Sequence, residues 1–147
     1  MGIDEAVNNF TVTVAAPPQV VHEVLVDVER WHLWNPFVKS ARLVTGAVLL
    51  GAEGIMEKST FPGEFPFTVV IRESGFGIRE VVPICGTDVA VVLERVVTPV
   101  DGGSLVEFSA HVLDGVDRAA IELNPLPFMV AELPEVLAGL AAHVEAR

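Results

Sequence analysis

Cysteine and tyrosine are scarce in this chain of 147 residues, which contains one cysteine and no tyrosine. The single thiol, Cys85, excludes an internal disulfide framework and any zinc site that needs several cysteines. Cys85 precedes a turn glycine and has no basic neighbour in the sequence, so it is predicted to be a small buried apolar side chain rather than a nucleophile. The lack of tyrosine removes one common general acid from any catalytic site.

Positive charge is scarce as well. The chain has 9 lysines and arginines against 20 aspartates and glutamates, which gives a net charge of −11. Such a chain repels a phosphate backbone, and it has no cluster of basic residues to replace the backbone's counterions. We therefore expect no nucleic-acid partner.

Long hydrophobic runs are missing, although 51% of the residues are hydrophobic and the mean hydropathy is +0.52. The longest apolar runs, such as VAVVL at 89–93, are far shorter than the roughly 18 residues of a membrane span. The N-terminal MGIDEAVNN has neither the basic flank nor the apolar stretch of a secretion signal, so we expect a cytoplasmic protein with no membrane partner. The surplus apolar side chains are expected to line an internal cavity, cover an interface or fill a dense core.

Motifs for metals and cofactors are incomplete. His22-Glu23 begins like the helix of a zinc protease, but position 26 is valine, so the second histidine ligand is missing. Gly75-Phe76-Gly77 lacks the third glycine of a dinucleotide-binding loop. The sequence has no phosphate-binding loop and no nucleophile elbow. We expect neither a metal nor a cofactor.

Strand and helix patterns follow a simple order. Residues 10–14, FTVTV, alternate as a half-buried strand does, and a helix with one apolar face is predicted from Pro18. A second short helix is predicted at 29–35, because Pro36 disfavours helical geometry in the residue before it. Six further strands, separated by turn residues, are predicted at 38–44, 53–60, 66–74, 77–84, 87–97 and 104–113. The turn at 99–103 is the strongest hairpin signal.

The C-terminal segment returns to helix. Pro134 fits a first helical turn, and an apolar stripe follows it as far as Val144. Residues 123–133 contain two more prolines, which are expected to prevent a continuous helix there. The result would be a loop or lid that carries Phe128 and Met129.

Together these elements predict an α+β fold in a single domain over 1–147. A seven-stranded curved antiparallel sheet is wrapped around a C-terminal helix, with two short helices after the first strand. No helix-length segment interrupts the last six strands, which favours an antiparallel meander. Wherever the terminal helix fails to fill the concave side of such a sheet, an internal pocket is left.

Three stretches resemble the START-like (SRPBCC) superfamily, and within it the small bacterial polyketide cyclase/dehydrase branch. They are APPQVVHEVLVDVERWHLWNPFVKSARLV at 16–44, VTPVDGGSLVEF at 97–108 and LAGLAAHVEAR at 137–147. The resemblance implies a helix-grip fold with a pocket between the sheet and the terminal helix, holding a hydrophobic or polycyclic molecule. The family's terminal helix is usually continuous, and the three prolines within 123–134 depart from that pattern.

Both tryptophans lie in the first of these stretches, three residues apart, and are therefore adjacent on one helical face. Trp31 is predicted to pack the short helices against the sheet as part of the scaffold. Trp34 is predicted to turn an edge towards the pocket. The candidate ligand-binding residues are Trp34, Phe67, Leu93, Phe128 and Met129.

The strand at 104–113, SLVEFSAHVL, is open to two interpretations. Its amphipathic pattern makes Glu107 and His111 part of a solvated row. Family spacing, counted back from Gly115, implies the opposite phase, with both residues facing the pocket. A one-residue bulge near Asp114 would reconcile the two phases.

The preceding strand raises the same question, because Glu94 and Arg95 are neighbours and point opposite ways. Family spacing implies that Arg95 faces inward with Leu93 and Val97. A buried arginine needs a partner, and either Glu107 or a carbonyl group of a ligand would serve.

Arg72 and Glu80 are weaker candidates for inward polar residues. For every charged candidate the alternative is an exposed position on the sheet. If the phase implied by the family holds, His111 is predicted to exchange protons near neutral pH. Arg95 is then predicted to stabilise an enolate or polarise a carbonyl, with Glu107 as the third catalytic candidate.

Three functions remain open at this point. The first is a cofactor-independent cyclase or dehydrase of polyketide-like natural-product biosynthesis, which folds a hydrophobic substrate in the internal pocket. The second is a non-catalytic binding or carrier protein for a hydrophobic small molecule. The third is a stress- or toxin-type protein that acts through its sheet face. A homodimer is among the oligomeric states that the sequence leaves open.

Overall fold

The structure, a computed structural model, describes residues 9–45, 51–60, 63–72, 75–83, 90–112 and 126–147. Side chains are described in these ranges except at 112 and 126–129. In chain order the elements are β1 (Asn9–Val14), α1 (Pro18–Val26), the 3-10 helix η1 (Val28–Leu33), β2 (Val38–Thr45), β3 (Ala52–Lys58), β4 (Glu64–Ile71), β5 (Phe76–Pro83), β6 (Ala90–Val100), β7 (Gly103–Val112) and α3 (Leu126–Glu145).

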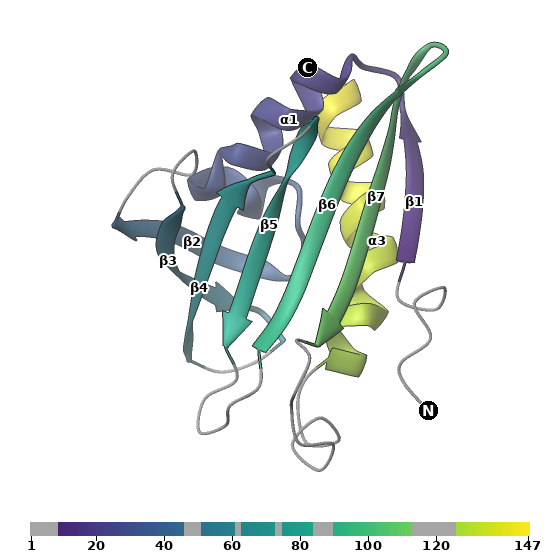
Figure 1. Cartoon of the computed structure of the whole chain (residues 1–147). Coiled ribbons are helices and arrows are strands. Elements are labelled where there is room, and N and C mark those ends of the chain that lie inside the picture. Colours follow the sequence, from purple (N-terminus) through teal and green to yellow (C-terminus); the bar gives the residue numbers. More distant parts are fainter. Residues whose placement is uncertain (1–8, 46–50, 61–62, 73–74, 84–89, 113–125) are drawn as a thin grey trace.

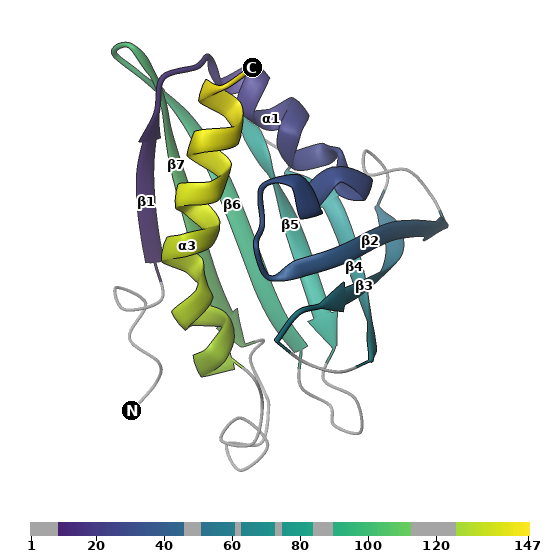
Figure 2. The same ribbon diagram turned by 180° about the vertical axis from the view of Figure 1, so that it is seen from behind.

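The strands form one seven-stranded antiparallel sheet in the order β1-β7-β6-β5-β4-β3-β2. The helices α1, η1 and α3 all lie on one face of this sheet, as the two opposite views show (Figures 1 and 2). In Figure 2, β2 passes in front of β4 and β5, so the sheet curls around its helical side. The predicted α+β helix-grip fold, with two short helices after the first strand, is confirmed.

The β6–β7 hairpin has a tighter turn than predicted. β6 continues through Pro99 to Val100, and only Asp101 and Gly102 remain between the strands. Gly102 has a φ of +83°, a left-handed conformation that glycine adopts without steric cost. The predicted turn over 99–103 was therefore in the right place but too wide, because Pro99 pairs as a strand residue with Ser104.

α3 contradicts the prediction that the terminal helix begins at Pro134. The helix starts at Leu126 and runs for 20 residues, through Pro127 and Pro134. Pro127 is the second residue of the helix, where the backbone N–H has no intrahelical partner to lose. Pro134 does remove one hydrogen bond, and the burial of Leu133 and Leu137 on the sheet side outweighs that loss. No helix in the described part of the chain has the length and apolar character to span a membrane.

The two tryptophans connect the helices to the sheet. The indole N–H of Trp31 donates a 2.9 Å hydrogen bond to the carbonyl oxygen of Leu25, and its ring centre lies 5.5 Å from that of Phe67 on β4. The Trp34 ring meets it edge-on, with 6.5 Å between the centres. α3 passes so close to this turn that a Cβ atom at Gly139 would stand 2.1 Å from the carbonyl oxygen of Trp34. Trp31 is therefore buried scaffold, as predicted.

His22 links α1 to the start of β5. Its Nδ1 atom accepts a 3.0 Å hydrogen bond from the backbone N–H of Gly77, and its ring meets Phe76 edge-on at 5.5 Å between centres. Burial lowers the pKa of His22 below its ordinary value of 6.5, and the negative charge of Glu23 offsets part of that effect. The folded state thus favours the neutral ring, which accepts this hydrogen bond at an unprotonated Nδ1.

We expect the protein to lose stability as the pH falls below 6.5, because His22 binds a proton more readily in the unfolded chain than in the folded one. The contribution is fully present above that pH and declines as the pH falls through the lower folded-state pKa. Urea unfolding between about pH 7.5 and pH 5 measures it. In His22→Asn the amide oxygen accepts the same bond without titrating, so wild type should lose more stability than this variant over the range. Parallel losses in both proteins would contradict this role of His22.

Candidate functional site

A pair of opposite charges lies on the concave face of the sheet. Arg95 on β6 and Glu80 on β5 meet through a 2.8 Å contact between Nη1 and Oε1, and their side chains are 6% and 1% exposed. The register places Ile78 directly opposite Arg95, so Glu80 is the diagonal neighbour of Arg95 on the same face. These strands are the third and fourth of the seven, which puts the pair near the middle of the sheet.

The alternation of β6 turns Arg95 inward in the way that family spacing implied. Leu93, Arg95 and Val97 are all buried, and Glu94 between them points to the outer face. The inward arginine therefore has its predicted neighbours. Its partner differs from the prediction, because Glu80 occupies the place expected for Glu107.

Aromatic rings enclose the guanidinium group of Arg95. Its Cζ atom lies 5.4 Å from the centre of the Trp31 ring and 5.0 Å from that of Phe108, the residue opposite it on β7. A cation is attracted to an aromatic face at such distances, and more strongly away from water. The rings therefore help to stabilise a charge that is costly to bury.

Three buried polar atoms in this region have no hydrogen-bond partner among the described residues. They are Nε of Arg95, Oε2 of Glu80 and Nε1 of Trp34. Buried polar atoms are nearly always paired, because leaving one unpaired costs about 1–3 kcal/mol. The two nitrogens are donors and the carboxylate oxygen is an acceptor. The region thus contains two donors and one acceptor that no described residue satisfies.

His111 and Glu107 lie on the face of β7 opposite to Arg95. The register pairs Arg95 with Phe108, so Glu107 beside it points the other way. Glu107 accepts a 2.9 Å hydrogen bond from Nδ2 of Asn9, and both Glu107 and His111 are partly exposed. The amphipathic phase of this strand is the one present, and the phase implied by family spacing is wrong. The three predicted catalytic residues are not brought together.

Arg72, the other weaker candidate, belongs to a separate charge cluster. Its Nε atom lies 4.0 Å from a carboxylate oxygen of Glu94, whose other oxygen lies 3.6 Å from Nε of Arg79. Glu94 and Arg79 face each other across β5 and β6 on the outer face. Of the two weaker candidates, only Glu80 is therefore part of the concave site.

The apolar candidates divide into two groups. Trp34, Phe67 and Leu93 are buried in the core. Phe128 and Met129 lie in the first turn of α3 rather than in a loop, and their side chains are outside the described residues. A role in ligand binding stays a prediction for all five.

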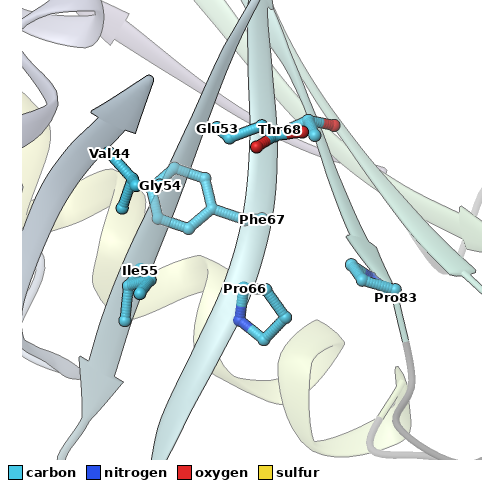
Figure 3. Close-up of a pocket in the computed structure, with 8 residues that line it drawn as sticks. All are labelled: Val44, Glu53, Gly54, Ile55, Pro66, Phe67, Thr68 and Pro83. Atoms are coloured by element: carbon cyan, nitrogen blue, oxygen red, sulfur yellow. The ribbon is translucent and has the colours of Figure 1, made fainter.

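A hollow of about 370 Å³ opens over β3 and β4, lined by the eight residues labelled in Figure 3. The Phe67 ring points towards Gly54 and Val44, with Pro66 and Pro83 on its other side. Gly54 makes this arrangement possible, because a Cβ atom there would stand 2.5 Å from the Phe67 ring. Phe67 is the one predicted ligand-binding residue among the described residues of this lining. Neither Glu80 nor Arg95 belongs to it, so the hollow is distinct from the buried charge pair.

The described ranges contain no group of three or more histidine, cysteine, aspartate or glutamate residues arranged to hold a metal ion. Cys85, predicted to be buried and unreactive, lies outside those ranges. The buried charge pair with its aromatic neighbours is therefore the candidate functional site.

Solved structures share this fold at low sequence identity. The di-domain ARO/CYC StfQ from the steffimycin biosynthetic pathway is 16% identical with a TM-score of 0.66 over 93% of this chain, which spans 44% of that protein. A STAR-related lipid transfer protein from Xanthomonas axonopodis is 17% identical with a TM-score of 0.64, covering 92% of this chain and 84% of the other. Protein TTHA0849 from Thermus thermophilus is 15% identical with a TM-score of 0.68, covering 94% and 96%. At such identities the likeness shows the fold alone.

A comparison with curated proteins gives no match. The family model described as "Polyketide cyclase / dehydrase and lipid transport" matches residues 9–145. That range runs from the first residue of β1 to the last residue of α3, so it contains every described strand and helix. With the START-like fold established, the chain belongs to the polyketide cyclase/dehydrase and lipid transport family of the START-like superfamily.

Proposed function

We propose that the protein is a cyclase/dehydrase-type enzyme that holds a hydrophobic substrate with several carbonyl groups on the concave side of its sheet. The observation behind this proposal is the buried Glu80–Arg95 pair, in which Oε2 and Nε have no partner among the described residues. A purely structural ion pair is expected to have its polar atoms satisfied, because partly satisfied buried networks are costly. Unused donors and acceptors beside aromatic rings suit a substrate that is mostly apolar and carries oxygen atoms.

Glu80 and Arg95 supply complementary chemistry to such a substrate. The free carboxylate oxygen of Glu80 accepts a proton from a carbon between two carbonyl groups. The Nε–H group of Arg95 donates a hydrogen bond to the enolate oxygen that forms. The enolate carbon then attacks a second carbonyl carbon of the same chain, and the new alkoxide takes the proton back from Glu80. Loss of that hydroxyl with a neighbouring hydrogen releases water, so atoms and electrons balance without a redox partner.

The aromatic neighbours contribute orientation. Trp31 and Phe108 fix the guanidinium group of Arg95, and the unpaired Nε1 of Trp34 offers a further donor for a substrate oxygen. Holding a flexible chain in a reactive conformation removes much of the entropic cost of ring closure. Exclusion of water strengthens each hydrogen bond to the substrate.

A carrier protein for the same class of molecule is the second candidate. It is favoured by the outward orientation of His111, which leaves the predicted proton-exchanging histidine off the concave face. It is also favoured by the near-complete burial of Glu80 and Arg95, since a base that meets substrate is usually more accessible. The two candidates share the binding step and differ in turnover.

Binding is tested with two polycyclic probes of matching shape, 1,8-dihydroxyanthraquinone and anthracene, followed by quenching of tryptophan fluorescence. The variant Glu80→Leu/Arg95→Met removes the polar groups and keeps apolar volume. We expect the quinone to bind about tenfold more weakly to this variant, because a charge-assisted hydrogen bond is worth roughly 1.5–3 kcal/mol. Anthracene should bind equally to both proteins.

The matched control is Arg79→Met/Glu94→Leu, which removes an ion pair from the same two strands on the outer face. It should leave both probes unaffected. Turnover is tested by mass spectrometry of a linear poly-carbonyl thioester incubated with the wild type, where cyclisation with dehydration removes the mass of one water. Binding of the quinone without turnover supports the carrier, and no loss of quinone binding in the Glu80/Arg95 variant contradicts both candidates.

A further inference from the structure

Glu132 of α3 connects the terminal helix to the far half of the sheet. One of its carboxylate oxygens pairs with the ammonium group of Lys58 at the end of β3, and the other accepts a 3.2 Å hydrogen bond from the hydroxyl group of Thr60. Both oxygens are therefore occupied. We call Lys58, Thr60 and Glu132 the latch.

The latch lies on the concave side of the sheet. Residues 52, 54 and 56 of β3 are buried, and Lys58 continues that inward row at the end of the strand. Its side chain is 14% exposed and that of Glu132 is 11% exposed, so the pair is mostly buried and only its edge reaches solvent. In Figure 2, α3 and the strands β2 and β3 lie on opposite sides of the concave face, with β6 and β5 visible between them. The latch bridges these two parts of the fold.

A second contact joins α3 to the end of η1, just before β2, and it is of a different kind. Gly139 lies seven residues after Glu132, which places both on one face of α3, about 10 Å apart along its axis. At Gly139 the helix is held directly against the carbonyl oxygen of Trp34, with no room for a Cβ atom. The Gly139–Trp34 contact is thus close-packed backbone, whereas the latch consists of polar side chains.

We propose that the latch controls access to the concave interior, opening at Lys58–Glu132 while the Gly139–Trp34 contact acts as the fixed end. A guest needs such a path, because Arg95 and Glu80 are almost completely enclosed. The Lys58–Glu132 pair is the more easily opened of the two contacts, because water can replace the hydrogen bonds of its polar side chains, whereas the Gly139–Trp34 contact is close-packed backbone. The use of this path by a substrate rests on the proposed function, but the access itself does not.

Access is tested without any ligand through hydrogen exchange of the two indole N–H groups. The N–H of Trp34 is buried without a partner among the described residues, whereas that of Trp31 is bonded to the carbonyl oxygen of Leu25. In Lys58→Glu the latch residues repel each other, and we expect the Trp34 N–H to exchange about tenfold faster. The charge swap Lys58→Glu/Glu132→Lys should return exchange to the wild-type rate.

Two references separate opening of the latch from general loss of stability. Unfolding exposes both indoles, so a merely destabilised variant would accelerate exchange at Trp31 and Trp34 together. The control variant Arg42→Met removes an exposed ion pair with Glu64 from the same half of the sheet and should change neither rate. Unchanged Trp34 exchange in Lys58→Glu, or equal acceleration of both indoles, would overturn the proposal.

A final measurement keeps the latch distinct from the proposed function. In stopped-flow experiments, Lys58→Met should speed both association and dissociation of 1,8-dihydroxyanthraquinone and leave its affinity nearly unchanged, because a gate alters the path and not the bound state. If Trp34 exchange responds to the latch but the quinone does not bind, the proposed function fails and controlled access stands. If the quinone binds with unaltered rates and Trp34 exchange does not respond, controlled access fails and binding stands.

Discussion

Arg95→Met is expected to lower the free energy of unfolding by about 3–5 kcal/mol, because it leaves the Glu80 carboxylate buried without its partner. The loss has this size because the Glu80 side chain is 1% exposed, so bulk solvent does not stabilise its charge. The substitution also removes the cation that contacts Trp31 and Phe108. Urea denaturation followed by tryptophan fluorescence measures the change.

The double variant Glu80→Leu/Arg95→Met should recover most of that loss, since an apolar pair of similar volume often matches or exceeds a buried ion pair in stability. Arg79→Met is the matched control on the outer face, where the side chain is 44% exposed, and it should cost less than about 1 kcal/mol. A double variant as unstable as Arg95→Met alone would show that the two charges are not coupled in the folded state.

Trp31→Ala is expected to cost about 3–5 kcal/mol, because the side chain is 1% exposed and its removal leaves a large cavity in the core. The ring contacts Phe67 and Arg95, and its N–H satisfies the carbonyl oxygen of Leu25. Loss of the ring therefore removes packing between η1 and the sheet and leaves one acceptor without its donor. Thermal and urea unfolding both report the change.

Leu33→Ala is the control for this substitution. Leu33 belongs to the same short helix but is 53% exposed, so its removal should change stability by no more than about 0.5 kcal/mol. Trp31→Phe should fall between the two, because most of the ring volume is kept while the hydrogen bond to Leu25 is lost. Equal effects of Trp31→Ala and Leu33→Ala would contradict the scaffold role of Trp31.

Most strands and the two short helices were predictable because their signals are local. Alternating side chains mark the strands, and turn residues such as Gly102 mark their ends. In β7 the local pattern also contained the right phase, since Val106 and Phe108 are the residues that bury apolar surface. Family spacing, counted back from Gly115, implied the opposite phase for that strand and was wrong. The phase follows the burial of the apolar side chains, because a shift by one residue would move all of them to the outer face.

Glu80 shows where the pattern of a single strand stops being informative. Alternate residues of β5 from Phe76 to Val82 are apolar except at Glu80, which was a signal for an inward carboxylate. That signal does not identify a partner, because the pairing with Arg95 depends on the register between two strands. Glu107 was predicted as the partner because the phase implied by family spacing placed its carboxylate on the inner face of the sheet.

The terminal helix was misjudged from its prolines. Their local effect favours a break, and that rule applies to an isolated segment. In the folded protein, Pro127 falls in the first turn, where it costs little, and the apolar residues around Pro134 are buried against the sheet. Tertiary packing supplies more free energy than one missing backbone hydrogen bond removes.

The amino-acid sequence by itself determined the order of elements and the antiparallel helix-grip sheet, because these follow from periodicity and turn chemistry, whereas the inward position of Arg95 was implied only by the family resemblance. Only the tertiary structure decided that Glu80 is the partner of Arg95, that Glu107 and His111 face away, and that Glu132 of α3 meets Lys58 of β3. Each of these contacts joins residues from different elements. Their geometry depends on strand register and on how the helix crosses the sheet, which no local pattern encodes.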